Sequence, residues 1–269
     1  MAQGPQIRLS RKVRGFFRGL GLRKYGIGVL TKTDQGFFVV DPKDFGVGRS
    51  LLDRGSYDAE VIKFLLNKID ANSTVVFVGA HIGAILIPIA KKAARVIAFE
   101  PNPATHEMLE ANVKLNCLSN VILYKFAASS KKELVKMQHN SINTGGSSVS
   151  TSQDSSGESV EAMPLDDLIG EEKIDLMVVD AEGFEAHVFA GAEKTLSNTT
   201  VLYTEYSPTM LVRQGTSPDR FFDALKKHFQ SMCIGTNESP KYSQSDWQNT
   251  LNNNNMAHKP SFLLNLTFF

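Results

Sequence analysis

The sequence has little cysteine and no long apolar run. Only Cys117 and Cys233 occur in 269 residues, which excludes a disulfide framework and a cysteine metal site. No apolar stretch approaches the roughly 18 residues of a membrane-spanning helix, and the N-terminus lacks the apolar core of a secretion signal. The expected compartment is therefore a reducing cytoplasm.

The chain also lacks a strong charge bias. Its net charge of +1 excludes a general attraction to nucleic acid, and 42% hydrophobic with 21% charged residues is ordinary for a globular protein. The first 24 residues are the exception, because they contain no acid and these bases: Arg8, Arg11, Lys12, Arg14, Arg18, Arg23 and Lys24. This segment could contact an anionic membrane surface. The alternative is a basic tail without a partner, since its glycines disfavour a helix.

We expect two parts in the chain. Residues 1–55 form the basic extension and a flanking segment, in which residues 36–48 predict a short strand and turns. That flank is either a lid over a ligand cleft or a cap over a sheet edge. Residues 56–269 form the main domain.

The most informative stretch is residues 74–102, which predicts a strand, a tight turn, a helix and a second strand ending in Glu100. Gly79 and Gly83 allow the backbone to approach a ligand closely, and the start of the helix presents free N–H groups. Glu100 follows Gly79 by about 20 residues, the spacing at which a carboxylate accepts from ribose hydroxyls. This pattern indicates an adenosine-containing cofactor.

His81 narrows the choice of cofactor. In a dinucleotide fingerprint the middle glycine makes room for the pyrophosphate, and His81 stands at that position. A nicotinamide or flavin dinucleotide is therefore disfavoured. S-adenosylmethionine has no phosphate, uses the ribose acid and tolerates a side chain at this position.

Apolar runs and helical segments alternate along residues 74–206, which predicts a doubly wound α/β fold with a mainly parallel sheet. Ligands bind at the carboxyl ends of such strands. We expect strands at 74–79, 95–100, 121–126, 174–180, 199–206, 230–235 and 261–268, and helices at 83–93, 103–116, 164–169, 184–195 and 217–228. Residues 141–159 are rich in Ser, Gly and Thr and predict a loop, either for substrate binding or as a plain connection. Residues 236–258 predict an irregular insertion.

Three acids stand where catalysis would need them. Asp180 ends a buried strand, Glu182 follows in the next turn, and Glu205 ends the neighbouring strand. Such carboxylates could orient the cofactor, act as general base or hold a divalent cation. The structural alternative is that the acids cap the following helix.

The chain resembles the FkbM-type S-adenosylmethionine-dependent methyltransferases between about residues 36 and 206. The segments that carry the resemblance are Gly79–Gly83, Ala98–Pro103, Leu115–Asn120, Ala127–Ser129, Gly145–Ser148, Leu165–Leu168, Ile174–Gly183 and Val201–Glu205. The resemblance implies a Rossmann-like class I fold, whose seven-stranded sheet has an antiparallel edge and helices on both faces. It further implies cofactor contacts from Gly79, Ala80, His81, Gly83, Glu100, Pro101, Asn102, Ala127 and Asp180.

By the same resemblance, the expected reaction is methylation of a hydroxyl on a saccharide or another polyhydroxylated metabolite. The alternatives are another acceptor, either a nitrogen or a small-molecule oxygen, and a non-catalytic relative that only binds the cofactor. The second alternative arises from Phe77, which stands where the family usually has an acid. His81 likewise replaces the usual Asn. No nucleic-acid partner is expected, and the oligomeric state is left open.

Overall fold

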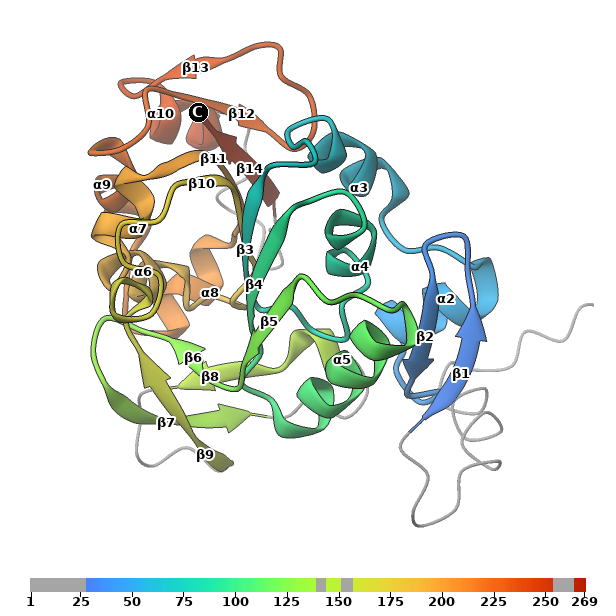
Figure 1. The fold of residues 1–269 in the computed structure, drawn as a ribbon. Helices are drawn as coiled ribbons and strands as arrows, with labels where there is room; N and C mark the ends of the chain where they lie inside the picture. The colour runs from blue at the N-terminus through green and yellow to red at the C-terminus, as the bar shows by residue number, and fades with distance from the viewer. Residues whose placement is uncertain (1–27, 139–143, 151–156, 254–263) are drawn as a thin grey trace, which may run out of the picture.

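The computed structural model describes residues 28–138, 144–150, 157–253 and 264–269. An eight-stranded sheet runs through the centre in the order β13-β12-β14-β11-β10-β3-β4-β5 (Figure 1). Five neighbouring strands are parallel: β5 (Val121–Tyr124), β4 (Arg95–Phe99), β3 (Thr74–Val78), β10 (Ile174–Val179) and β11 (Thr199–Tyr206). The antiparallel edge consists of β14 (Leu264–Phe268), β12 (Ser231–Ile234) and β13 (Tyr242–Ser243). The predicted fold is confirmed, and the two-residue β13 adds an eighth strand.

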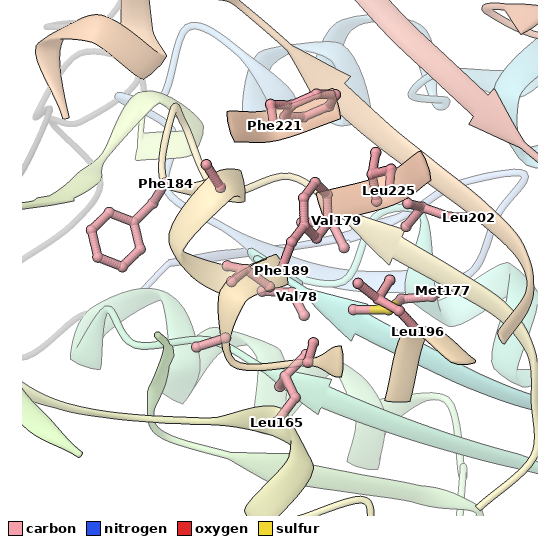
Figure 2. Close-up of a cluster of buried hydrophobic side chains, with 14 of the residues drawn as sticks. Val78, Leu165, Met177, Val179, Phe184, Phe189, Leu196, Leu202, Phe221 and Leu225 are labelled. Atoms are coloured by element: carbon pink, nitrogen blue, oxygen red, sulfur yellow. The ribbon is translucent and has the colours of Figure 1, made fainter. Parts of the chain in front are cut away.

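Helices cover both faces of this sheet (Figure 1). One apolar cluster lies on one face of the sheet, at β3, β4 and β10. The helices that pack against this face are α2 (Val47–Arg54), α3 (Ala59–Leu66), α4 (Leu86–Ala90) and α5 (Pro103–Leu115). The other face packs against α6 (Glu185–Ala190), α7 (Glu193–Ser197), α8 (Pro208–Arg213), α9 (Pro218–Lys226) and α10 (Trp247–Asn253). Figure 2 shows side chains of this second cluster, among them Val179 of β10, Phe189 and Phe221, and the rings of Phe189 and Phe221 pack edge-on with centroids 5.3 Å apart. Two buried faces explain why the central strands read as continuous apolar runs.

The sequence prediction was wrong about part of residues 127–163. Four strands form a second sheet there, in the order β6-β9-β7-β8. They are β6 (Ala127–Ala128), β7 (Glu133–Gln138), β8 (Ser148–Ser150) and β9 (Glu158–Met163). Val135 and Met137 of β7 are buried while their neighbours are more exposed, so one face of this sheet packs on the core. The predicted loop at 141–159 is thus partly strand, and its residues 141–143 and 151–156 lie outside the described part.

Three predicted helices are shorter than expected, and the one placed at 164–169 is only the short 3-10 helix Leu165–Asp167. The helix placed at 83–93 is α4 (Leu86–Ala90), because Pro88 has no N–H to bond a carbonyl four residues earlier and fits only near a helix start. The helix placed at 184–195 is divided into α6 and α7. Gly191 causes the division, since a Cβ there would lie 2.0 Å from the carbonyl oxygen of Ser129, and the chain turns at this close contact.

The flank before α3 packs directly on the domain. β1 (Val29–Lys32) and β2 (Phe37–Val40) form a hairpin, and the N–H of Val39 donates to the side chain of Asn112 at 2.5 Å. Asp44 accepts a hydrogen bond from the N–H of Thr144 at 3.1 Å, which joins the flank to the second sheet. The division of the chain at residue 55 stays a prediction. Residues 1–24, proposed for membrane contact, lie outside the described residues.

The predicted insertion at 236–258 contains β13 and α10 within its described portion. Trp247 of α10 is fully buried and packs edge-on against Phe268 of β14 at 5.0 Å between ring centroids. The insertion therefore closes one end of the core. Among the residues described, no helix has the length and apolarity to cross a membrane.

Candidate active site

A cavity of about 380 Å³ opens at the carboxyl ends of β3, β4, β10 and β11. Parallel strands place their following turns at one edge, so residues far apart in sequence meet there. The walls contain Gly79, Glu100, Asp180 and Glu205, one from the end of each strand. The volume falls in the range of small-molecule sites, which is about 300 to 1,000 Å³.

Gly79 is required by its contact with the neighbouring turn. Its φ is +80°, and a Cβ at this position would lie 1.8 Å from the carbonyl oxygen of Asp180. The N–H groups of Gly79 and Ala80 both donate to the carbonyl of Phe99, at 2.9 and 3.1 Å. The turns after β3, β4 and β10 are thus held against one another.

Glu100 is fixed by the backbone around it. One carboxylate oxygen accepts from the N–H of His81 at 2.8 Å, and the other accepts from the N–H of Asn102 at 2.9 Å. The residue is 6% exposed and lines the cavity. Burial raises the pKa of Glu100 to about 7, and the two hydrogen bonds limit this rise because they favour the charged form. The carboxylate has lone pairs left for a ligand.

His81 adopts a left-handed conformation with φ of +50°. Its Nε2 lies 2.9 Å from Oγ1 of Thr144, while its Nδ1 is buried without a hydrogen-bond partner. Burial lowers the pKa of His81 to about 4, so the ring is neutral at physiological pH. His81 is therefore a wall of the cavity, joined through Thr144 to the second sheet.

The other predicted cofactor residues divide into two groups. Ala80, Pro101 and Ala127 line the cavity. Asn102 instead caps α5, where its side-chain oxygen accepts from Ala104 and Thr105. Gly83 lies behind the turn, where a Cβ would approach Leu109 at 2.8 Å. A cofactor contact from Asn102 or Gly83 stays a prediction.

The three predicted catalytic acids come together. Asp180, Glu182 and Glu205 each offer a carboxylate oxygen, and these atoms all lie within 4.8 Å of one another. Strand pairing explains the meeting, because Val179 at the end of β10 pairs with Thr204 of β11. Glu182 reaches the same point because its backbone is left-handed, with φ of +52°.

Burial raises the pKa of all three acids. Asp180 is exposed to the cavity, but protein atoms surround its carboxyl group. The resulting desolvation raises the pKa of Asp180 to about 6. Desolvation and then the charge of Asp180 raise the pKa of Glu182 to about 8, and the same two causes raise that of Glu205 to about 11. Crowded carboxylates resist ionisation in this way when no cation neutralises them.

The helix-capping alternative fits another residue. Glu185, not the three acids, accepts from the backbone N–H groups of Ala181 and Gly183, at 2.9 and 3.2 Å. The side chains of Asp180 and Glu182 accept no hydrogen bond from the residues that the structure describes. Their position is thus unexplained by the local needs of α6.

Sequence reasoning missed several polar residues of the cavity. Tyr57 and Asp58 enter it from the start of α3, and Tyr203 and Asn265 enter it from β11 and β14. The alternation of β11 carried a signal for Tyr203, because residues two apart on a strand share a face and Tyr203 precedes Glu205 by two. Tyr57 and Asp58 directly precede α3, where no motif marks them.

Phe77 packs in the core and also lines the cavity. It is 3% exposed and stands between Ala98 and Val178 across the neighbouring strands. An acid at this position would be buried among apolar side chains. The cavity wall is apolar here, and Glu100 is the nearby polar group predicted to contact the cofactor.

Comparison with known proteins identifies the family. The model of the methyltransferase FkbM domain matches residues 78–231, more than half of the chain. The chain belongs to the FkbM methyltransferase family. The matched range begins at the last residue of β3 and contains the glycine turn, Glu100 and the acids of the cavity.

Individual relatives of this FkbM protein are similar over shorter parts. The 2-O-methyltransferase NoeI of Sinorhizobium fredii is 41% identical over 75 residues, which are 27% of this chain and 30% of that protein. A probable ribosomal RNA small subunit methyltransferase A of Methanosphaera stadtmanae is 28% identical over 106 residues, 39% of this chain and 32% of that protein. The matches thus cover less than a third of either relative.

A solved structure is similar over a larger part. The FkbM methyltransferase of Methylobacillus flagellatus matches with a TM-score of 0.48 and 18% identity, over 75% of this chain and 44% of that one.

Family membership implies S-adenosylmethionine as the methyl donor, and the cavity fits this molecule. Gly79 and Glu100 line the cavity, and the Glu100 carboxylate, held by two backbone hydrogen bonds, can accept from ribose hydroxyls. Apolar residues such as Phe99 and Phe126 line the same cavity and suit an adenine ring. Acids near Asp180 suit the positive charge on its sulfur.

Proposed function

We propose that the protein transfers the methyl group of S-adenosylmethionine to a hydroxyl of a saccharide or another polyhydroxylated molecule. The observation that carries this proposal is the convergence of Asp180, Glu182 and Glu205 within 4.8 Å, at the edge of the sheet beside the glycine turn. When bound, the cofactor supplies a methyl group whose C–S bond breaks as the new C–O bond forms, with the electron pair left on sulfur. The chain must orient the hydroxyl and accept its proton.

Asp180 is the proposed general base. It lies at the end of β10, its carboxyl is exposed to the cavity, and it accepts no hydrogen bond from the described residues. Its pKa of about 6 leaves it mostly ionised near pH 7, and a base with this pKa can still hold a proton during the reaction. Glu182 and Glu205 are proposed to orient the acceptor. A divalent cation held by the trio is the other means of activating the hydroxyl.

The cavity favours a neutral, hydroxyl-rich acceptor. Its described walls include the hydroxyls of Tyr57, Tyr203 and Thr144 and the amide of Asn265, and they include no Lys or Arg. Nucleic-acid sites depend on Lys and Arg to neutralise phosphates. Similarity to a 2-O-methyltransferase supports the same choice of acceptor.

A ribosomal RNA acceptor is the second candidate, because a probable ribosomal RNA methyltransferase is also similar to this chain. The described walls of the cavity argue against it.

The two free cysteines, Cys117 and Cys233, support the cytoplasm as the proposed location.

The test is a methyl-transfer assay with labelled S-adenosylmethionine and separate pools of neutral glycans, phosphorylated sugars and ribosomal RNA. We expect label in a neutral glycan, as an ether that survives mild alkali, and little label in the other pools. Asp180→Asn should lose this labelling, and Glu161→Gln should keep it, because Glu161 is exposed on β9 and is not among the residues that line the cavity. Label in RNA alone, or none in any pool, would overturn the proposal.

A further inference from the structure

The end of the cavity formed by β10 and β11 contains oxygen atoms without partners. Glu205 is 8% exposed, and its Oε2 is buried with no hydrogen-bond partner. Tyr203 is 4% exposed, and its hydroxyl is likewise buried without a partner. Both residues line the cavity and lie two apart on β11, so they share a face. A buried polar group without a partner is costly, which indicates that a ligand supplies the partner.

No described side chain supplies a positive charge at this point. The described walls of the cavity contain no Lys or Arg, and the ion pairs found among the described residues do not include Asp180, Glu182 or Glu205. His81, the histidine of the wall, uses its Nε2 toward Thr144. Three converging carboxylates therefore lack a neutralising group.

The distances fit a metal ion. The carboxylate oxygens of the trio lie within 4.8 Å of one another. Two oxygens on opposite sides of Ca²⁺ are separated by about 4.6 to 5.2 Å, and on opposite sides of Mg²⁺ by about 4.2 Å. The upper limit of 4.8 Å on each separation is compatible with either ion after the side chains close in, and the closure is smaller for calcium than for magnesium. An all-oxygen set excludes the soft metals as the preferred occupant.

We propose that Asp180, Glu182 and Glu205 form a binding site for one hard divalent cation. Its role in catalysis rests on the proposed function, but the binding of the cation itself does not. The Tyr203 hydroxyl and water complete the set of oxygen ligands. Three carboxylates from β10, its following turn and β11 thus form a site that requires no other part of the chain.

The cation would act on the acceptor hydroxyl. A hydroxyl oxygen that contacts the cation has a lower pKa, so its proton passes more readily to the second carboxylate oxygen of Asp180. The oxygen then takes the methyl carbon, the C–S bond breaks, and the electron pair stays on sulfur. All atoms and charges balance without an oxidant or a reductant.

The test is calorimetry on the metal-free full chain, titrated separately with Mg²⁺, Mn²⁺ and Ca²⁺. We expect one ion bound per chain for at least one of these metals. Glu205→Gln should weaken that binding by at least about tenfold, because even the loss of an outer partner costs about 10- to 100-fold. The control Glu161→Gln has the same chemistry on an exposed site of β9 and should bind as the parent does.

A thermal unfolding experiment keeps the test valid if a variant folds poorly. The saturating metal should raise the unfolding midpoint of the parent and of Glu161→Gln, and should raise that of Glu205→Gln by clearly less. Asp180→Asn provides a second variant of the trio, with the same expected loss. Absence of binding up to about 10 mM of each metal, a range that already spans weak calcium sites, or equal binding by Glu205→Gln would overturn the proposal.

These outcomes are separate from those of the methylation assay. Methyl transfer that persists in the presence of a chelator, with no metal bound, would contradict a role of the cation in catalysis. The general base would then be the means by which the hydroxyl is activated. Metal binding without methyl transfer to any glycan would support the metal site and contradict the proposed function.

Discussion

The two ends of the cavity differ in how their polar atoms are satisfied. At the end formed by β3 and β4, Glu100 accepts two backbone hydrogen bonds, and the N–H groups of Gly79 and Ala80 are both bonded. At the end formed by β10 and β11, the Oε2 of Glu205 and the hydroxyl of Tyr203 have no partner. At the first end the carboxylate and the N–H groups of the turn have partners within the chain, and the Nδ1 of His81 is the exception. At the second end, the described residues supply no partner for these two oxygen atoms.

The difference follows from the secondary structure at each end. Turns after β3 and β4 bring free backbone N–H groups toward a single acid, which is what a strand followed by a helix provides. The turn after β10 directs its own N–H groups to Glu185, so Asp180 and Glu182 remain for a ligand. Glu185 thus accepts the hydrogen bonds from the N–H groups of this turn. The carboxylates of Asp180 and Glu182 are therefore available for a ligand.

Gly79 joins the two ends, and its substitution should have the largest effect. In Gly79→Ala the Cβ would meet the carbonyl oxygen of Asp180, 1.8 Å away, in addition to the strain of a φ of +80°. We expect a loss of about 2 to 5 kcal/mol in the free energy of unfolding, from overpacking and left-handed strain together. Denaturant unfolding measures this loss.

Gly55 provides the matched control. Its φ is +69°, and nothing lies within 4 Å of its Cβ position. Gly55→Ala should therefore show only the left-handed strain, about 1 to 2 kcal/mol. Equal losses in the two variants would mean that the contact with Asp180 is unimportant.

Asp180→Asn should separate turnover from stability. The substitution keeps the shape of the side chain and removes its charge and most of its basicity. A fall in turnover of about a hundredfold or more is expected, with a nearly unchanged thermal midpoint, because this carboxyl accepts no hydrogen bond from the described residues. Turnover at saturating acceptor is the measurement. Parent-like turnover would place the base elsewhere, and Glu182→Gln and Glu205→Gln would then identify it.

The comparison of the two ends also explains what the sequence could predict. The end formed by β3 and β4 follows from local rules: the strand, the glycine turn and Glu100 stand in one continuous stretch of residues 74–102. The meeting of Asp180 with Glu205 could be predicted as well, because both follow apolar strands whose ends share an edge. Their role as catalytic residues remains a prediction.

Other features depend on contacts that no local pattern shows. Tyr57 and Asp58 line the cavity from the segment before α3, far in sequence from the acids that follow β10. The second sheet was missed because its strands are short and interrupted by Ser- and Gly-rich residues, although Val135 and Met137 do alternate. The division between α6 and α7 depends on how closely Gly191 approaches Ser129, a tertiary contact.

Glu100→Ala tests whether the satisfied end binds the cofactor. Loss of the carboxylate removes charge-assisted hydrogen bonds to the ribose, worth about 1.5 to 3 kcal/mol, so affinity should fall about tenfold to a hundredfold. Calorimetry with S-adenosylhomocysteine measures binding without turnover. Glu100→Gln keeps the volume and should also weaken binding, which separates lost charge from an empty space. Parent-like affinity in both folded variants would remove Glu100 from the cofactor site.

The smallest expected effect is a dependence of cofactor affinity on pH. The pKa of Glu100 is raised to about 7 by burial, so the side chain is increasingly protonated below pH 7 and then accepts poorly from two hydroxyls. Binding to the ionised form alone predicts that affinity falls about tenfold from pH 8 to pH 6. His81 stays neutral over this range because its pKa is about 4.

Asp180 also titrates in this range, since its pKa is about 6, and the Glu100→Gln variant separates the two acids. Without the Glu100 carboxyl, the affinity for S-adenosylhomocysteine should be low and nearly constant between pH 8 and pH 6.5. A pH dependence that persists unchanged in Glu100→Gln would assign it to Asp180 instead. The end of the cavity formed by β10 and β11 would then take part in cofactor binding. The proposal that the cofactor is bound by the end formed by β3 and β4 alone would be wrong.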